Sequence, residues 1–110
     1  MGKKRKVMAH INLFTPVPHL ENEEHTTTLL SHPHATLLRL VSPPHFKSAP
    51  FCQKEDEWVS LLQGEATLDI AGKWHTLRAG DTVFIPANTP HQVVDTSETP
   101  LAIWLTVHLF

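Results

Sequence analysis

Short apolar segments, interrupted by polar residues and turn signals, follow one another along most of the chain. The clearest pattern lies at 65–71, where Ala66, Leu68 and Ile70 alternate with polar residues, so that the apolar side chains fall on one face of an extended segment. No segment is long enough and periodic enough to predict a helix. The pattern therefore predicts β-strands.

Turn residues divide the chain into a series of predicted strands. They include Ser42-Pro-Pro44 and the tight hairpin signal Ala71-Gly72-Lys73. The predicted strands are 34–41, 57–63, 65–71, 74–77, 82–85, 91–95 and 101–109, with shorter candidates at 10–14 and 26–30. About eight short strands at near-regular spacing predict an all-β sandwich or barrel.

The composition fits one small globular domain. The chain has 110 residues, of which 41% are hydrophobic and 18% are charged, as is usual for folded globular proteins and unlike disordered or membrane proteins. No apolar run approaches the ~20 residues that a membrane-spanning helix needs, and we expect no membrane partner. We expect residues 1–9 to form a basic, flexible extension and residues 10–110 to form a single domain.

The charge distribution and the cysteine content limit the classes of binding partner and the cellular compartment that we expect. The net charge is −2, but residues 3–6 hold four of the nine basic residues, so the remainder has five basic residues against 11 acidic ones. An acidic body is a poor docking surface for nucleic acid, and we expect no such partner. The basic tip resembles a nuclear import signal, although a solvated terminus is the interpretation we favour. Cys52 is the only cysteine, which fits a reducing compartment and a cytoplasmic location.

Two stretches of the chain carry recognisable spacings. The first reads Gly80-Asp-Thr-Val-Phe-Ile-Pro86-Ala-Asn-Thr-Pro-His91, with glycine, proline and histidine at fixed intervals. The second has Glu57, then six residues, then Gly64. Together these stretches resemble the two motifs of the cupin family. The resemblance covers nearly all of residues 10–110 and implies an all-β fold, a single cupin-type double-stranded β-helix or jelly-roll barrel, as in small stand-alone bacterial cupins of unassigned function.

The chain departs from the family pattern at several positions. Asn88 stands where the family has glycine, a mild change because asparagine tolerates positive φ better than most residues. Asp95 replaces the final asparagine of that motif. In the other motif, Phe51 and Gln53 occupy the two histidine positions. These last two changes weaken the metal-binding set that the family usually carries.

The resemblance implies a metal site inside the barrel. In the family, the motif residues converge on one divalent metal, and by position this chain supplies Gln53, Glu57 and His91, with Phe51 in place of the remaining ligand. Residues 51, 53 and 57 share strand parity and face inward if the strands are regular. One amide, one carboxylate and one imidazole could hold Zn, Ni, Mn or Fe, with water completing the coordination.

Three further residues are candidates to complete this set. His45 would serve if its loop folds back, Cys52 if the alternative spacing to Glu57 applies, and His108 if its side of the last strand faces the barrel. The structural alternative is that Glu57 is a solvated carboxylate at a strand start and His91 a turn-end histidine bonded to the backbone. Their occurrence at paired motif positions favours a shared pocket.

These observations predict a small barrel with a divalent-metal pocket that acts on or binds a small organic molecule. The alternative is a nonenzymatic binding or sensing barrel with a degraded metal site. A third interpretation is a structural role, in which the apolar residues Ile11, Leu13 and Phe14 cover a partner's edge strand. We expect a homodimer. The sequence assigns neither a substrate nor a catalytic residue, and it leaves open whether the protein is an enzyme.

Overall fold

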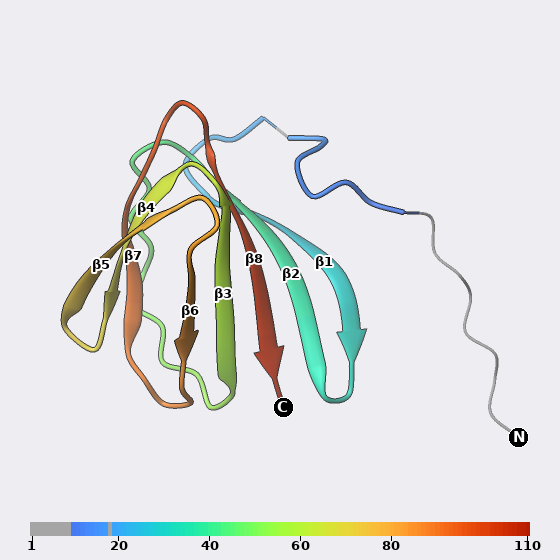
Figure 1. Cartoon of the computed structure of the whole chain (residues 1–110), viewed down its shortest axis with the longest axis vertical. Helices are drawn as coiled ribbons and strands as arrows, with labels where there is room; N and C mark the ends of the chain where they lie inside the picture. Colours follow the sequence, from blue (N-terminus) through green and yellow to red (C-terminus); the bar gives the residue numbers. More distant parts are fainter. Residues whose placement is uncertain (1–9, 18) are drawn as a thin grey trace, which may run out of the picture.

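In the part of the chain that the structure describes, eight β-strands form two antiparallel sheets that face each other (Figure 1). The computed structural model describes residues 10–17 and 19–110, and within these it contains no helix, so none that could span a membrane. The strands are β1 (His25–His32), β2 (Ala35–Ser42), β3 (Asp56–Gln63), β4 (Glu65–Ile70), β5 (Lys73–Arg78), β6 (Thr82–Ile85), β7 (His91–Thr96) and β8 (Ala102–Leu109). The prediction of an all-β fold is confirmed.

The larger sheet has five strands in the order β1-β2-β8-β3-β6, and the smaller has three in the order β5-β4-β7. The chain passes from one sheet to the other at Gly64, between β3 and β4. Gly64 has a φ of 83°, and an added Cβ would lie 2.6 Å from Ser97 Oγ and 3.0 Å from Leu101 O. Only glycine fits this close approach, which explains its place in the motif.

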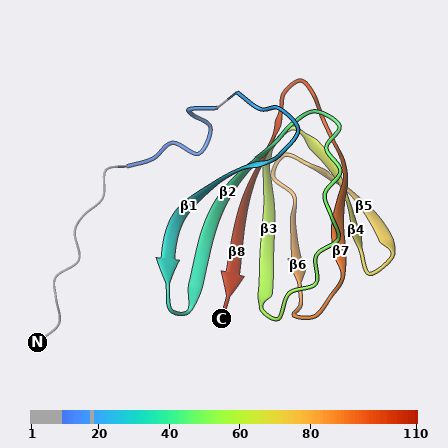
Figure 2. The same cartoon turned by 180° about the vertical axis from the view of Figure 1, so that it is seen from behind.

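The long connection from β2 to β3 closes an edge of the smaller sheet. Figure 2 shows this connection running beside β7. Its backbone donates hydrogen bonds to β7 from His45 to Thr96 and from Ser48 to Val93, and Phe51 pairs with His91 in both directions. These bonds satisfy the edge of β7, which would otherwise be exposed.

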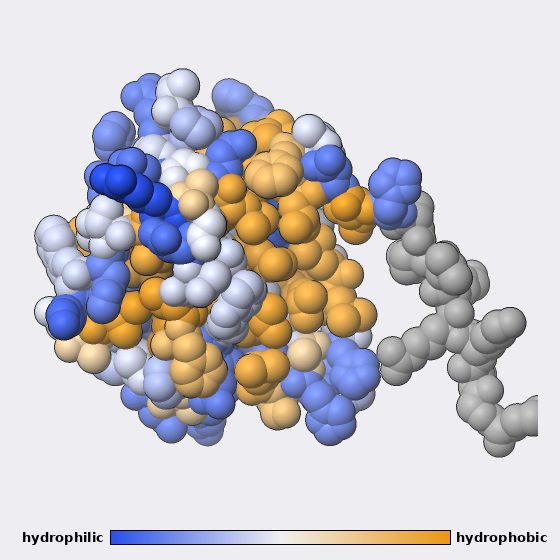
Figure 3. All heavy atoms as spheres, in the orientation of Figure 1, coloured by the Kyte–Doolittle hydropathy of each residue, from blue (hydrophilic) through white to orange (hydrophobic). Residues whose placement is uncertain are grey.

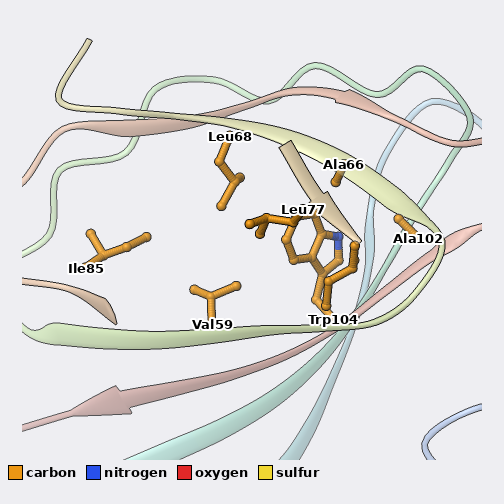
Figure 4. Packing of buried hydrophobic residues seen from close by; sticks show 8 residues of the cluster. Val59, Ala66, Leu68, Leu77, Ile85, Ala102 and Trp104 are labelled. Atoms are coloured by element: carbon orange, nitrogen blue, oxygen red, sulfur yellow. The ribbon is translucent and has the colours of Figure 1, made fainter. Parts of the chain in front are cut away.

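The core lies between the sheets. Figure 4 shows Val59 and Leu68 pointing toward each other from opposite sheets, with Trp104 beside Ala102. On β3, the alternation that buries Val59 also turns Glu57 inward. The alternation that forms the core therefore also places the Glu57 carboxylate inside the barrel.

The N-terminal predictions had different outcomes. The predicted strand at 26–30 is confirmed and extends over β1. The candidate strand at 10–14 is wrong, because this segment forms a turn in which Asn12 Oδ1 accepts a hydrogen bond of 2.8 Å from the backbone N–H of Phe14. An asparagine side chain that bonds its own backbone competes with strand pairing. The basic extension at 1–9 lies outside the described residues.

Candidate functional site

A cavity of about 300 Å³ lies between the two sheets. Its size is at the lower end of small-molecule pockets. The lining is mainly aliphatic and aromatic, with polar side chains concentrated around Glu57. The lining residues are Glu24, Thr26, Leu38, Leu40, Phe51, Gln53, Glu57, Val59, Leu68, Ile85, His91, Val93, Trp104, Thr106 and His108. The arrangement suits a molecule with an apolar body and a polar end.

The three residues expected from the motifs meet in this cavity. Gln53 Nε2 donates a hydrogen bond of 2.6 Å to Glu57 Oε1. His91 Nε2 lies 3.3 Å from the same oxygen, and the side chains of Glu57 and His91 are each only 9% exposed. Phe51 also lines the cavity, with its ring centroid 5.7 Å from that of His91. The residues of both motifs therefore share one pocket.

Local backbone contacts position these side chains. Phe51 N–H donates to His91 O at 2.7 Å and His91 N–H donates to Phe51 O at 2.9 Å, which fixes the two motifs against each other. Asn88 has a φ of 60°, as its place at a motif glycine predicts, and its N–H donates to Gln53 O at 2.7 Å. The turn that follows brings His91 to the start of β7, facing Glu57.

Glu57 and His91 stabilise each other in their charged forms. Burial raises the pKa of the Glu57 carboxyl, but the hydrogen bond with His91, the charge of His108 and the hydrogen bond from Gln53 outweigh burial, so the pKa lies below its usual value. Burial lowers the pKa of His91, but its hydrogen bonds with Glu57 and with Thr89 O outweigh burial and raise it. The protonated ring can donate from Nδ1 to Thr89 O, 2.9 Å away, and from Nε2 to Glu57.

His108 is the candidate that the structure brings to the site. Its Nε2 lies 3.6 Å from Glu57 Oε2, and its Nδ1 lies 3.3 Å from Glu55 Oε2. Sequence reasoning could not assign its direction. The available signal was the two-residue spacing from the buried Trp104 through Thr106 to His108, which places all three on the inner face of β8.

The other two candidates lie elsewhere. His45 Nδ1 is 3.2 Å from Asp95 Oδ1 in a surface pair, with the histidine side chain 70% exposed. Cys52 is exposed. Neither residue lines the cavity. The backbone pairing of the β2–β3 connection with β7 holds both side chains away from Glu57.

The donor types at the site suit a divalent transition metal, but their arrangement is a hydrogen-bonded cluster. Within residues 10–17 and 19–110, no group of three or more His, Cys, Asp or Glu side chains is placed to hold a metal ion. His91 Nδ1 lies 2.9 Å from Thr89 O, the kind of acceptor that metal-binding histidines usually have, whereas His108 Nδ1 makes no hydrogen bond within the described residues, although Glu55 Oε2 is 3.3 Å away. However, the two histidines approach different oxygens of Glu57, and Gln53 directs its amide nitrogen at the carboxylate.

Solved structures share the fold. The crystal structure of a "putative mannose-6-phosphate isomerase" from Ralstonia eutropha JMP134 is similar with a TM-score of 0.82 and 28% identity, over 92% of this chain and 97% of that one. A cupin superfamily protein from Desulfitobacterium hafniense DCB-2 has a TM-score of 0.76 and 17% identity, over 86% and 84% of the two chains. A polyketide cyclase from Streptomyces resistomycificus has a TM-score of 0.70 and 20% identity, over 79% and 65%.

The sequence comparison identifies the family. No curated protein matches the chain. The family described as "Cupin domain" matches residues 38–108, a segment that runs from β2 to β8 and contains both motifs. This segment is more than half of the 110 residues. The protein is therefore a small member of the cupin domain family.

Proposed function

We propose that the protein binds a small organic molecule in the cavity, with Glu57 and His91 at the polar end of the site. The supporting observation is a nearly buried carboxylate–imidazole pair at one end of an apolar cavity of about 300 Å³. Charge-assisted hydrogen bonds in such a place are stronger than those at a surface. A hydroxyl group on the ligand can donate a hydrogen bond to the Glu57 carboxylate, which protonated His91 holds in place.

The charge of the lining argues against a phosphorylated ligand. The similar structure named for mannose 6-phosphate suggests a sugar phosphate as one possibility. Among the described residues, the cavity lining contains Glu24 and Glu57 but no lysine or arginine, whereas phosphate sites usually present such cations or backbone N–H groups. We therefore propose an unphosphorylated ligand.

A divalent transition metal held by Gln53, Glu57 and His91 is the second candidate function. The observation in its favour is His108, which adds a second imidazole to the carboxylate and would complete a set of two histidines and one carboxylate. A bound Zn, Ni, Mn or Fe ion would polarise a ligand carbonyl or enolate oxygen. Because His91 must lose a proton to coordinate, metal uptake would increase as the pH rises through its pKa.

One set of variants separates the two candidates. Metal content would be measured by elemental analysis on tag-free protein purified without a nickel column. The proteins compared are the wild type, Glu57→Ala, His91→Ala and the surface control His45→Ala. About one equivalent of metal, lost in the first two variants and kept in the control, would establish the metal function. If metal is absent, or persists in all variants, the metal function fails.

Ligand binding would be screened by ligand-observed NMR on the same proteins. Small amphiphilic molecules that bind the wild type and the control, but bind His91→Ala at least tenfold more weakly, would support the proposed function. A screen without any cavity-dependent binder would overturn it. Turnover of a bound molecule that disappears in His91→Ala would make the protein an enzyme and not only a binding module.

We also propose that two copies associate through the outer face of the larger sheet. Figure 3 shows apolar side chains gathered over this part of the molecule. Phe84 on β6, which pairs with Trp58 on β3, is 53% exposed. Ile11 and Phe14, expected to reach a partner, are also exposed. Light scattering should give about twice 12.4 kDa, and a single 12.4 kDa species would refute the homodimer.

A further inference from the structure

The cavity has a second carboxylate besides that of Glu57. Glu24 directly precedes β1 and lines the cavity beside the end of β2. Its Oε2 accepts a hydrogen bond of 2.7 Å from Ser42 Oγ, which in turn accepts one of 2.9 Å from Trp104 Nε1. Trp104 and His108 are four residues apart on the inner face of β8, or roughly 13 Å along the strand. The cavity therefore has an acidic group toward each end.

Between these ends lies a buried hydroxyl group without a partner. Thr106 lines the cavity on β8 midway between Trp104 and His108, and the residue is 2% exposed. Its Oγ1 makes no hydrogen bond within the part of the chain that the structure describes. Buried hydroxyl groups in folded proteins nearly always have a partner. An unpaired one in a cavity wall is available to a polar atom of a ligand.

The two carboxylates of the cavity differ in the groups that balance their negative charge. Glu57 has His91 and His108 beside it, whereas the hydrogen bond to Glu24 comes from a neutral serine. Burial raises the pKa of Glu24, the Ser42 hydrogen bond lowers it, and the charge of Glu57 raises it, with a net increase. Among the residues that the structure describes, the lining holds no lysine or arginine, so a cationic group on a bound molecule would supply Glu24 with a positively charged partner.

We propose that the cavity takes an arylalkylamine, whose ammonium group binds Glu24 while its ring packs on the apolar wall. This rests on the proposed function, since it specifies the ligand of the same cavity. A cavity of about 150 Å³ accommodates benzene, so about 300 Å³ holds one ring and a short chain. Leu40, Val59 and Trp104 supply the apolar surface for the ring.

The test uses three probes of similar shape and different charge: 2-phenylethylamine, 2-phenylethanol and 3-phenylpropionate. Affinities would be measured by NMR titration at pH 7 for the wild type, Glu24→Gln and the control Glu23→Gln, an exposed glutamate in the same segment. We expect the wild type to bind the amine at least tenfold more tightly than the carboxylate. Glu24→Gln should weaken amine binding roughly tenfold or more, as loss of a charged hydrogen bond does, and should leave alcohol binding within about threefold.

The possible failures are distinguishable. If the alcohol binds but the amine has no advantage over the carboxylate, the amine inference is wrong and the proposed small-molecule function stands. Equal losses of amine binding in Glu24→Gln and Glu23→Gln would overturn it in the same way. If none of the three probes binds, both the inference and the proposed small-molecule function lose their support. The ranking of the probes on the wild type needs no variant, so a Glu24 variant that fails to fold leaves the inference testable.

Discussion

Replacing Glu57 by glutamine tests whether the carboxylate stabilises the folded protein. The carboxylate accepts a hydrogen bond from Gln53 at 2.6 Å and lies 3.3 Å from His91 Nε2. Its pKa falls below the usual value although burial acts in the opposite direction, which means that its partners outweigh the cost of burial. Glutamine keeps the shape and removes the charge, so the variant changes few other contacts.

The size of the effect follows from the two hydrogen bonds. Hydrogen bonds to a charged group contribute about 1.5–3 kcal/mol and neutral ones about 0.5–1.5 kcal/mol. Glu57→Gln replaces two charged hydrogen bonds by neutral ones, which should reduce the free energy of unfolding by about 2 kcal/mol. In a domain of this size, the melting temperature should fall by roughly 10 °C. Glu98→Gln, which removes an exposed carboxylate, should change stability by less than about 0.5 kcal/mol.

The effect should depend on pH in a defined window. A lowered pKa in the folded state means that Glu57 stabilises the protein above its ordinary value of 4.5, and that this is lost as the pH falls through the lowered pKa. The raised pKa of His91 stabilises the protein below 6.5, and this is lost as the pH rises through the raised pKa. Urea unfolding followed by tryptophan fluorescence should therefore show a larger difference between wild type and Glu57→Gln at pH 5.5 than at pH 9. An equal difference at the two pH values, or a variant as stable as the wild type at pH 5.5, would refute the reasoning.

Five further substitutions, at four positions, test the backbone and the cavity wall. Gly64→Ala should destabilise the protein by about 2 kcal/mol or more and Gly72→Ala by about 1 kcal/mol in chemical denaturation, because both have positive φ but only Gly64 has atoms in the way; equal losses would contradict this. Thr106→Val should raise the free energy of unfolding by about 1 kcal/mol, since it removes an unpaired buried hydroxyl group, and a loss of stability would show that the hydroxyl has a partner. Asn88→Val should lower the melting temperature by several degrees and Asn88→Gly should not, because φ is 60° there; similar values would exclude backbone strain as the cause.

Most of the fold could be predicted from the sequence because it depends on local rules. Short runs of β-forming residues bounded by turn signals located β2 to β8, and Gly64 and the Ala71-Gly72 pair marked turns whose positive φ the structure contains. The failure came at 10–14, where apolar residues suggested a strand. A strand needs a neighbour to pair with, and Asn12 bonds its own segment instead. Alternation alone carries no information about whether a pairing partner exists.

Only the residues of the candidate site that belong to the two motifs could be predicted from the sequence. Position in the motifs brought Gln53, Glu57 and His91 to one pocket, and the structure places them within hydrogen-bonding distance. Glu24 was not predicted, because it belongs to no motif and meets the cavity through Ser42, 18 residues away in sequence. Such a contact depends on how β1 and β2 pair, which hydrophobic periodicity does not fix.

The register of β8 against β3 explains why His108 belongs to the site and His45 does not. β8 runs antiparallel to β3, with His108 opposite Glu57 and Thr106 opposite Val59. Each inward-facing residue of β8 therefore lies directly opposite an inward-facing residue of β3. A shift of one residue would turn Trp104, Thr106 and His108 outward together and place Leu105 and Val107 in the cavity. Burying Trp104 therefore also fixes the position of His108. His45 instead lies in the β2–β3 connection, where its side chain pairs with Asp95 at the surface. The core packing of one strand thus supplies a polar residue of the candidate site.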